Sequence, residues 1–243
     1  WFGRRWVRLA IQRHLSADAP LRASASAIRR ARSRAEDRLS HLVTQTMLAG
    51  LYAQKKSWPQ AIILFEDALA EARLSELKLI EAGVLETLAL AYEANGNRDK
   101  AIENWNNLLQ LGEQIGNRTF VAESHLKMGV LNAQKNQIDA AISHLETALS
   151  LYRSLENPRL QKESMIALAG LYEKTNNNES LAAMSEEAVG VANNLKEPSL
   201  RIAAYASKGY ALAKLGKSQD ALKAFEEAVN TFESIEVPSE ADI

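Results

Sequence analysis

The stretch SWPQAIILFEDAL, residues 57–69, joins a polar turn to an amphipathic run, and it recurs further along the chain. Its counterparts follow at a constant step, from Ser57 to Asn97 and on to Gln137, and read NRDKAIENWNNLL at 97–109 and QIDAAISHLETAL at 137–149. Within the first stretch, Ala61, Phe65, Ala68 and Leu69 are spaced as residues on one helical face. A turn followed by an amphipathic helix therefore recurs with a period of forty positions.

The same period holds in the half of each unit that precedes the turn. When the units are aligned, each aligned position forms a column. One column holds a small residue in every unit: Ala49, Ala89, Gly129, Ala169 and Gly209. Small residues let two helix backbones approach closely, and the large apolar columns fill the space between successive units. Each unit is thus predicted to be two antiparallel helices, and stacked units bury the apolar face that one unit alone would expose.

The pattern of LAGLY at 48–52 and LALAY at 88–92, followed by Ala, an aromatic residue and Ala, resembles the tetratricopeptide repeat family. The resemblance covers residues 39–237 as five units and implies an all-α, right-handed superhelix, an α-solenoid of antiparallel helix pairs. The step of forty positions exceeds the usual family period of about 34 and indicates a long-helix variant. The fourth unit departs most, with Leu181 and Ser185 in the columns of Ala and an aromatic residue.

The forty-residue pattern can also be followed toward the amino terminus, through residues 1–38. We interpret this segment as a degenerate sixth helix pair that caps the stack, which gives about twelve helices in all. Residues 238–243 form a short tail. The chain begins at Trp1 without an initiator Met, so we expect it to be a fragment or a processed product of a longer protein.

The segment 1–38 is strongly basic, with ten Arg against three acidic residues and a net charge of +7, whereas the remainder carries −8. The start of this segment combines aromatic and basic side chains: Trp1, Phe2, Arg4, Arg5, Trp6 and Arg8. They fit a capping helix with solvated arginines, or a membrane-proximal segment that follows an upstream anchor. A nucleic-acid contact is a third reading, which the lack of further stacking aromatics disfavours.

The composition, with 47% hydrophobic and 24% charged residues, is that of a globular protein, and the absence of Cys excludes disulfides and thiolate metal sites. The four His residues lie at no metal-binding spacing, and the sequence has neither a phosphate-binding loop nor a nucleophile elbow. We therefore expect no catalytic site, no metal and no cofactor.

The family resemblance implies that the first helix of each pair lines a concave groove that binds peptides or partner helices. The matching columns combine apolar and acidic residues, which suits a helix or peptide with apolar anchors and basic flanks. An acidic chaperone tail is excluded as a ligand, because like charges would repel it. The predicted partner-binding residues are Thr46, Glu86, Leu90, Glu93, Glu123, Leu126, Val130, Glu163, Ile166 and Tyr210.

These expectations define a protein–protein interaction scaffold or adaptor, tethered to a membrane by an upstream segment, that assists complex assembly or enzyme recruitment. Two alternatives stay open, a nucleic-acid-binding helical repeat and the regulatory domain of a larger enzyme. The column Thr46, Glu86, Leu126, Ile166 and Ala206 is no base-reading code, which argues against the former. The basic, aromatic start resembles cyanobacterial membrane-anchored tetratricopeptide proteins, which implies the cytoplasmic side of a thylakoid or plasma membrane; a soluble cytoplasmic location is the alternative.

Overall fold

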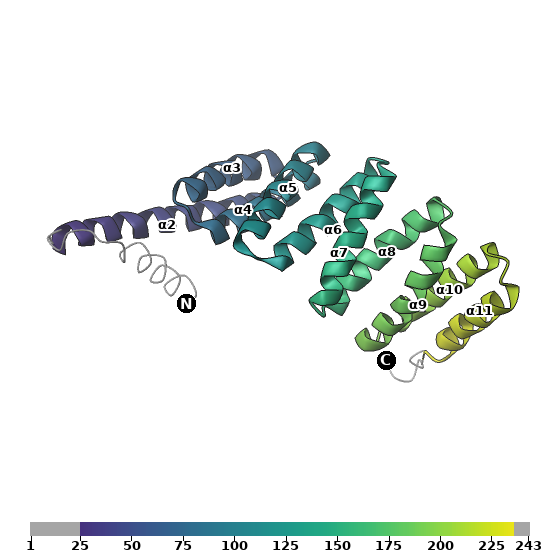
Figure 1. Cartoon of the computed structure of the whole chain (residues 1–243). Helices are drawn as coiled ribbons and strands as arrows, with labels where there is room; N and C mark the ends of the chain where they lie inside the picture. The colour runs from purple at the N-terminus through teal and green to yellow at the C-terminus, as the bar shows by residue number, and fades with distance from the viewer. Residues whose placement is uncertain (1–24, 236–243) are drawn as a thin grey trace, which may run out of the picture. The chain divides into compact units, whose positions relative to one another are not determined.

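The computed structural model describes the backbone of residues 25–235 and the side chains of residues 37–235. In this range the chain forms ten α-helices and no strand (Figure 1), as the fold class predicted from the sequence requires. The helices are α2 (Ala25–Gln54), α3 (Trp58–Leu74), α4 (Lys78–Ala94), α5 (Arg98–Ile115), α6 (Arg118–Gln134), α7 (Ile138–Ser154), α8 (Pro158–Lys174), α9 (Asn178–Leu195), α10 (Pro198–Lys214) and α11 (Ser218–Glu233).

Every helix from α2 to α10 ends in the same way, at a residue with positive φ, and these residues recur every 20 positions. Glycine supplies this conformation without strain at Gly96, Gly116 and Gly216. The backbone N–H of the next residue then donates to a carbonyl inside the helix, as Asn97 does to Tyr92 at 2.9 Å. The turns within and between the repeats therefore share one backbone geometry. The positions in this geometry are Lys56, Glu76, Gly96, Gly116, Asn136, Glu156, Asn176, Lys196 and Gly216.

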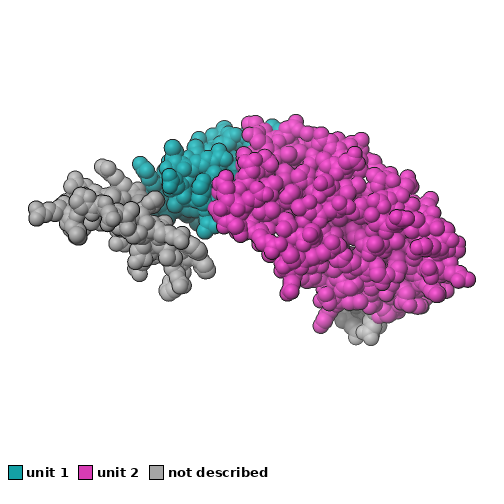
Figure 2. Space-filling model, viewed as in Figure 1, with its two compact units in different colours: residues 1–97 teal, residues 98–243 magenta. Residues whose placement is uncertain are grey.

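The chain divides into two compact units, residues 1–97 and residues 98–243 (Figure 2). In the first, α3 packs against both α2 and α4. In the second, each helix from α5 to α11 packs against its neighbours in sequence. Within each unit the order of contacts follows the order of the chain, as expected for stacked repeats.

The column of small residues lets the neighbouring helix approach closely at Gly129 of α6 and Gly209 of α10, as the sequence predicts. A Cβ atom on Gly129 would lie 2.6 Å from Cγ of Leu145, and one on Gly209 would lie 2.8 Å from Cε1 of Phe225. Both distances are far below van der Waals contact, so only glycine lets these large side chains of α7 and α11 approach so closely.

A tyrosine of the first helix links successive repeats in both units. In the first unit, the hydroxyl of Tyr92 donates to the carboxylate of Glu66, from α4 to α3. In the second, the hydroxyl of Tyr172 donates to Glu146 at 2.6 Å, from α8 to α7, and burial raises the pKa of Tyr172. The equivalent of both tyrosines in α6 is Asn132.

The amino-terminal boundary differs from the prediction. The sequence pattern places the end of a capping helix pair at residue 38, but α2 passes through this position as one helix of 30 residues. The segment contains no Pro and is rich in Ala, Arg and Leu, which all favour the helix interior. The first helix of the predicted pair, within residues 1–24, and the tail at 238–243 lie outside the described residues.

Candidate interaction surface

The predicted groove columns of the second unit lie on α6, α8 and α10, and most of them reach the surface. Glu163 and Ile166 of α8 are exposed, whereas Glu123 and Val130 of α6 and Tyr210 of α10 are half-buried. Ile166 is 59% exposed, a large exposed fraction for an aliphatic side chain of a helix. It follows Glu163 by three positions on α8, so that an apolar and an acidic group share one helical face.

Leu126 was predicted to belong to this open surface, and the prediction is wrong in that respect. Leu126 is only 4% exposed and belongs to the buried cluster of the second unit, although it occupies the same column as Ile166. The same cluster contains the large ring of Tyr152, whose counterpart one repeat later is the smaller Ala192. Leu126 is therefore a packing residue.

Val130 and Tyr210 lie at the edge of this surface. Both side chains pack against the buried cluster while remaining partly open to solvent. The ring of Tyr210 also faces the ammonium of Lys214, whose Nζ atom lies 5.4 Å from the ring centroid. This distance suits a cation–π contact and orients the ring along α10.

The predicted site residues of the first unit lie on α2 and α4. Leu90 is exposed, and Thr46, Glu86 and Glu93 are half-buried. The hydroxyl of Thr46 donates to the backbone carbonyls of Leu42 and Val43 of its own helix, at 3.0 and 2.9 Å. These residues form the same combination of apolar and acidic groups as the surface in the second unit.

Tyr152 of α7 is a polar residue of the second unit that sequence reasoning missed. Its side chain is fully buried, and its hydroxyl has no hydrogen-bond partner. Burial raises the pKa of Tyr152, and the nearby carboxylates of Glu123 and Glu163 raise it further. These two acidic groups belong to the predicted surface, one on α6 and one on α8. A buried hydroxyl without a partner lowers the stability of the fold.

One signal in the sequence could have identified Tyr152. The other repeats in the interior of the stack have a small residue at the aligned position, namely Ala72, Gly112 and Ala192. A tyrosine at such a position brings a hydroxyl into a region where the other repeats place no polar group.

The structure also pairs two histidines that are 19 positions apart. His125 of α6 and His144 of α7 lie with their Nδ1 atoms 2.9 Å apart and their ring centroids 5.1 Å apart. One ring donates and the other accepts, which requires at least one of them to be neutral. Burial lowers the pKa of both rings, and the charge of His144 lowers that of His125 further, while Glu113 opposes the shift. Among the described residues, no group of three or more His, Asp or Glu side chains could hold a metal ion.

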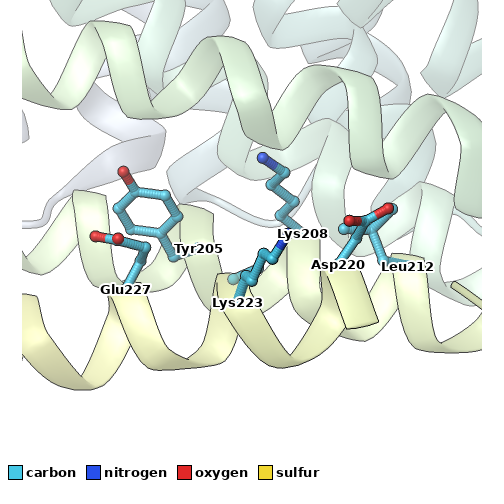
Figure 3. A pocket seen from close by; sticks show the side chains of 7 residues that line it. Tyr205, Lys208, Leu212, Asp220, Lys223 and Glu227 are labelled. Carbon is cyan, nitrogen blue, oxygen red and sulfur yellow. The ribbon is translucent and has the colours of Figure 1, made fainter. Parts of the chain in front are cut away.

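A shallow pocket lies between α10 and α11 (Figure 3). Its rim combines Tyr205 and Lys208 of α10 with Asp220, Lys223 and Glu227 of α11. Lys208 also pairs with Glu186 of α9. Two Lys and two acidic side chains line this pocket, so it lacks the charge of one sign that would favour an ion. We therefore assign the candidate surface to the first helices.

Two further predictions concern the membrane. In the part of the chain that the structure describes, no helix is long and apolar enough to cross a bilayer. The residues predicted to lie near a membrane, Trp1, Phe2, Arg4, Arg5, Trp6 and Arg8, are outside the described residues.

The arrangement defines a class, an α-solenoid of helix pairs with an open face on its first helices. Comparison with known proteins supports the predicted family. Residues 81–154 and residues 202–232 match family models described as tetratricopeptide repeat. Repeats of this family generally serve as non-catalytic scaffolds for protein–protein interaction. The sequence matches no curated protein.

Several solved structures share the fold. The crystal structure of BtubC from P. vanneervenii superimposes with a TM-score of 0.66 and 21% identity, covering 87% of this chain and 89% of BtubC. MamA gives a TM-score of 0.62 and 19% identity, covering 81% of this chain and 97% of MamA. Aspartyl phosphate phosphatase F from Bacillus subtilis gives 0.63 and 13% identity, covering 93% of this chain and 60% of the phosphatase. At these identities the likeness concerns the fold alone.

The contrast between Leu126 and Ile166 predicts different effects of the same substitution. Leu126→Ala removes buried methyl groups and should lower the free energy of unfolding by about 2–5 kcal/mol. Ile166→Ala, in the same column of the next repeat, should change it by no more than about 0.5 kcal/mol. Urea unfolding followed by circular dichroism measures both. Equal destabilisation by the two variants would show that Ile166 is also buried in the folded protein.

The histidine pair predicts a pH dependence of stability. Both rings have a lowered pKa in the folded chain, so the unfolded chain binds more protons below about pH 6.5, the usual pKa of histidine. The pair's contribution to stability is therefore present above this pH and is lost as the pH falls toward the lowered values. His144→Gln should make the free energy of unfolding depend less on pH between about pH 7.5 and 5.5 than in the wild type. An unchanged slope for His144→Gln would contradict the account.

Proposed function

We propose that this chain is a non-catalytic adaptor that holds a segment of a partner protein on the first-helix face of its second unit. One observation carries the proposal: Ile166, an isoleucine more than half exposed, shares this face with Glu163. An apolar side chain left open on a helix that packs on both of its neighbours contributes little to folding. Its burial by a partner would supply binding energy, at about 25 cal/mol per Å² of apolar surface before the costs of association.

The charges on this face indicate the kind of segment it would bind. Glu123 of α6 and Glu163 of α8 place two carboxylates on this face, the first half-buried and the second exposed. Carboxylates on one face attract a basic side chain and repel an acidic tail. The proposed ligand is therefore a helix or extended peptide with an apolar anchor for Ile166 and a Lys or Arg beside it.

This proposal is tested with a defined probe, an amphipathic peptide that carries leucine anchors and lysine flanks, and a second peptide with glutamate in place of lysine. The lysine peptide should bind the wild type more tightly than the glutamate peptide does, and the difference should shrink at high salt. Ile166→Asp should weaken binding of the lysine peptide by roughly tenfold or more, which corresponds to about 1.4 kcal/mol. Fluorescence anisotropy gives the affinities, and circular dichroism checks that helicity is kept.

Ile63→Asp is the matched control, because Ile63 of α3 is 58% exposed but lies on a second helix. It should bind the lysine peptide as the wild type does. Equal binding by the Ile166→Asp and Ile63→Asp variants would show that the first-helix face is not the binding surface.

We further infer that the scaffold works close to a membrane, where it assists complex assembly or recruits an enzyme. The support comes from the sequence, in which aromatic residues alternate with Arg4, Arg5 and Arg8 at the start of the chain. The location proposed is the cytoplasmic face of a thylakoid or plasma membrane.

The membrane contact predicts that the chain sediments with vesicles that contain anionic phosphatidylserine more than with vesicles of phosphatidylcholine alone. Replacement of Arg4, Arg5 and Arg8 by Gln should remove this difference, since each basic residue near such a surface contributes about 1 kcal/mol. If the variant and the wild type sediment equally with the anionic vesicles, the basic start of the chain does not contact the membrane.

A further inference from the structure

The last described helix, α11, carries an apolar stripe that no other described residue covers. We call the residues Leu222, Phe225, Val229 and Phe232 the trailing stripe; they follow one another at helical spacing along α11. Leu222, Val229 and Phe232 are each more than half exposed. The contact of α11 with α10 is made by Ala221, Ala224 and Ala228, which are buried, and by one edge of the Phe225 ring, which lies against Gly209. Leu222, Val229 and Phe232 are more than half exposed, so these three residues of the trailing stripe contribute little to packing within the last repeat.

The same columns are covered wherever a further repeat follows. In α7, the counterparts of Phe225, Val229 and Phe232 are Leu145, Leu149 and Tyr152, and all three are almost fully buried. α7 lies between α6 and α8, so both of its faces are covered. The repeat itself therefore shows what the trailing stripe fits, namely the first helix of another pair.

Among the described first helices, α2 has the complementary face open. In α2, Leu48 is 44% and Leu51 is 56% exposed, and we call these two residues, with Thr44 and His41, the leading stripe. In α8 the counterparts of Leu48 and Leu51 are Leu168 and Leu171, which are buried because α7 packs on α8. The leading stripe thus has the pattern of a first helix that no described second helix precedes.

An internal contact indicates which polar groups would meet at such a junction. The last turn of a second helix contacts the first turn of the next helix through the same two columns in both units. Nε of Arg73 in α3 donates to Glu81 of α4 at 3.0 Å, and Nη1 of Arg201 in α10 donates to Asn193 of α9 at 3.5 Å. The corresponding residues at the free ends are Glu233 of α11 and His41 of α2. The carboxylate of Glu233 can accept a hydrogen bond from the ring N–H of His41.

The charges of the two helices are complementary. α11 contains four acidic residues and one Lys, a net charge of −3, whereas residues 38–54 of α2, the part that aligns with the other first helices, contain one Arg and no acidic residue, a net charge of +1. Two α11 helices packed on each other would bring like charges together, and α11 packed on α2 brings opposite charges together. Charge therefore favours a contact between unlike ends.

We propose that copies of this chain associate end to end, with the trailing stripe of α11 in one copy packed on the leading stripe of α2 in the next. The contact continues the repeat across the boundary between molecules and uses different surfaces on the two copies. Each copy can then bind one neighbour at each end. The first-helix face of the second unit is a different surface from both stripes.

Two single substitutions and their mixture test this proposal by sedimentation velocity over a concentration series. Val229→Glu places a charge in the trailing stripe, and Leu51→Glu places one in the leading stripe. The wild type should form species larger than a dimer as concentration rises, and each variant alone should associate at least roughly tenfold more weakly. An equimolar mixture of the two variants should recover association but stop at dimers, because one intact stripe of each kind remains. Ile63→Glu, at an exposed apolar residue outside both stripes, is the control and should behave as the wild type.

A second measurement uses the polar contact and does not alter the apolar stripes. Glu233→Arg should weaken association of the chain, and combination with His41→Glu should restore it, because the pair is then reversed. High salt should weaken the association of the wild type. Circular dichroism of each variant verifies that the helices are intact.

Three outcomes would overturn the proposal. A wild type that stays monomeric at all concentrations would mean that the stripes do not bind a second copy. Loss of association in Val229→Glu but not in Leu51→Glu would indicate a symmetric contact between two α11 helices. A mixture of the two variants that stays monomeric would show that the stripes do not pair with each other.

Discussion

No helix pair of this chain can bury both faces of its second helix, so each second helix depends on the first helix that follows it. This requirement explains the fixed period of forty positions, because the columns that meet must recur at the same step. It also explains the glycine at Gly129, where the approach of Leu145 leaves no room for a Cβ atom. The stacking is therefore a contact between neighbours, and stability comes from pairs of adjacent helices and not from one central core.

The same requirement divides the apolar side chains into those that stacking buries and those that stay open to a partner. Side chains that a neighbouring helix covers serve packing, as do Leu126 and Tyr152 in the second unit. Other side chains of the first helices are left open, and among them are Ile166 and carboxylates such as Glu163. The proposed binding of a basic, apolar segment uses what stacking leaves open. The stripes on α2 and α11 are open for another reason, since they are stacking columns without a neighbour in the described chain.

Much of this could be predicted from sequence, because periodicity reports which residues share a helical face. The helix pairs, the polar turns and the small columns follow from the repeat alone. Other features depend on details that a column does not contain. Glu76 ends α3 with a positive φ, yet the aligned Glu36 lies inside the continuous helix α2. Leu126 and Ile166 occupy the same position of the repeat, yet Leu126 is buried and Ile166 is exposed. The contact between His125 and His144 joins two helices, and no spacing rule for metal ligands detects it.

Native-state hydrogen exchange of a dilute sample at high salt tests the central claim, that each second helix is stabilised by the first helix that follows it. α7 and α11 are both second helices of the second unit, but α7 is covered by α8, whereas the trailing stripe of α11 is open. The account predicts that the amides of α7 are much more protected than those of α11, since local opening costs less where fewer apolar contacts are lost. Equal protection of the two helices would contradict it, because the second unit would then unfold as a whole and the stacking of neighbours would not determine local stability.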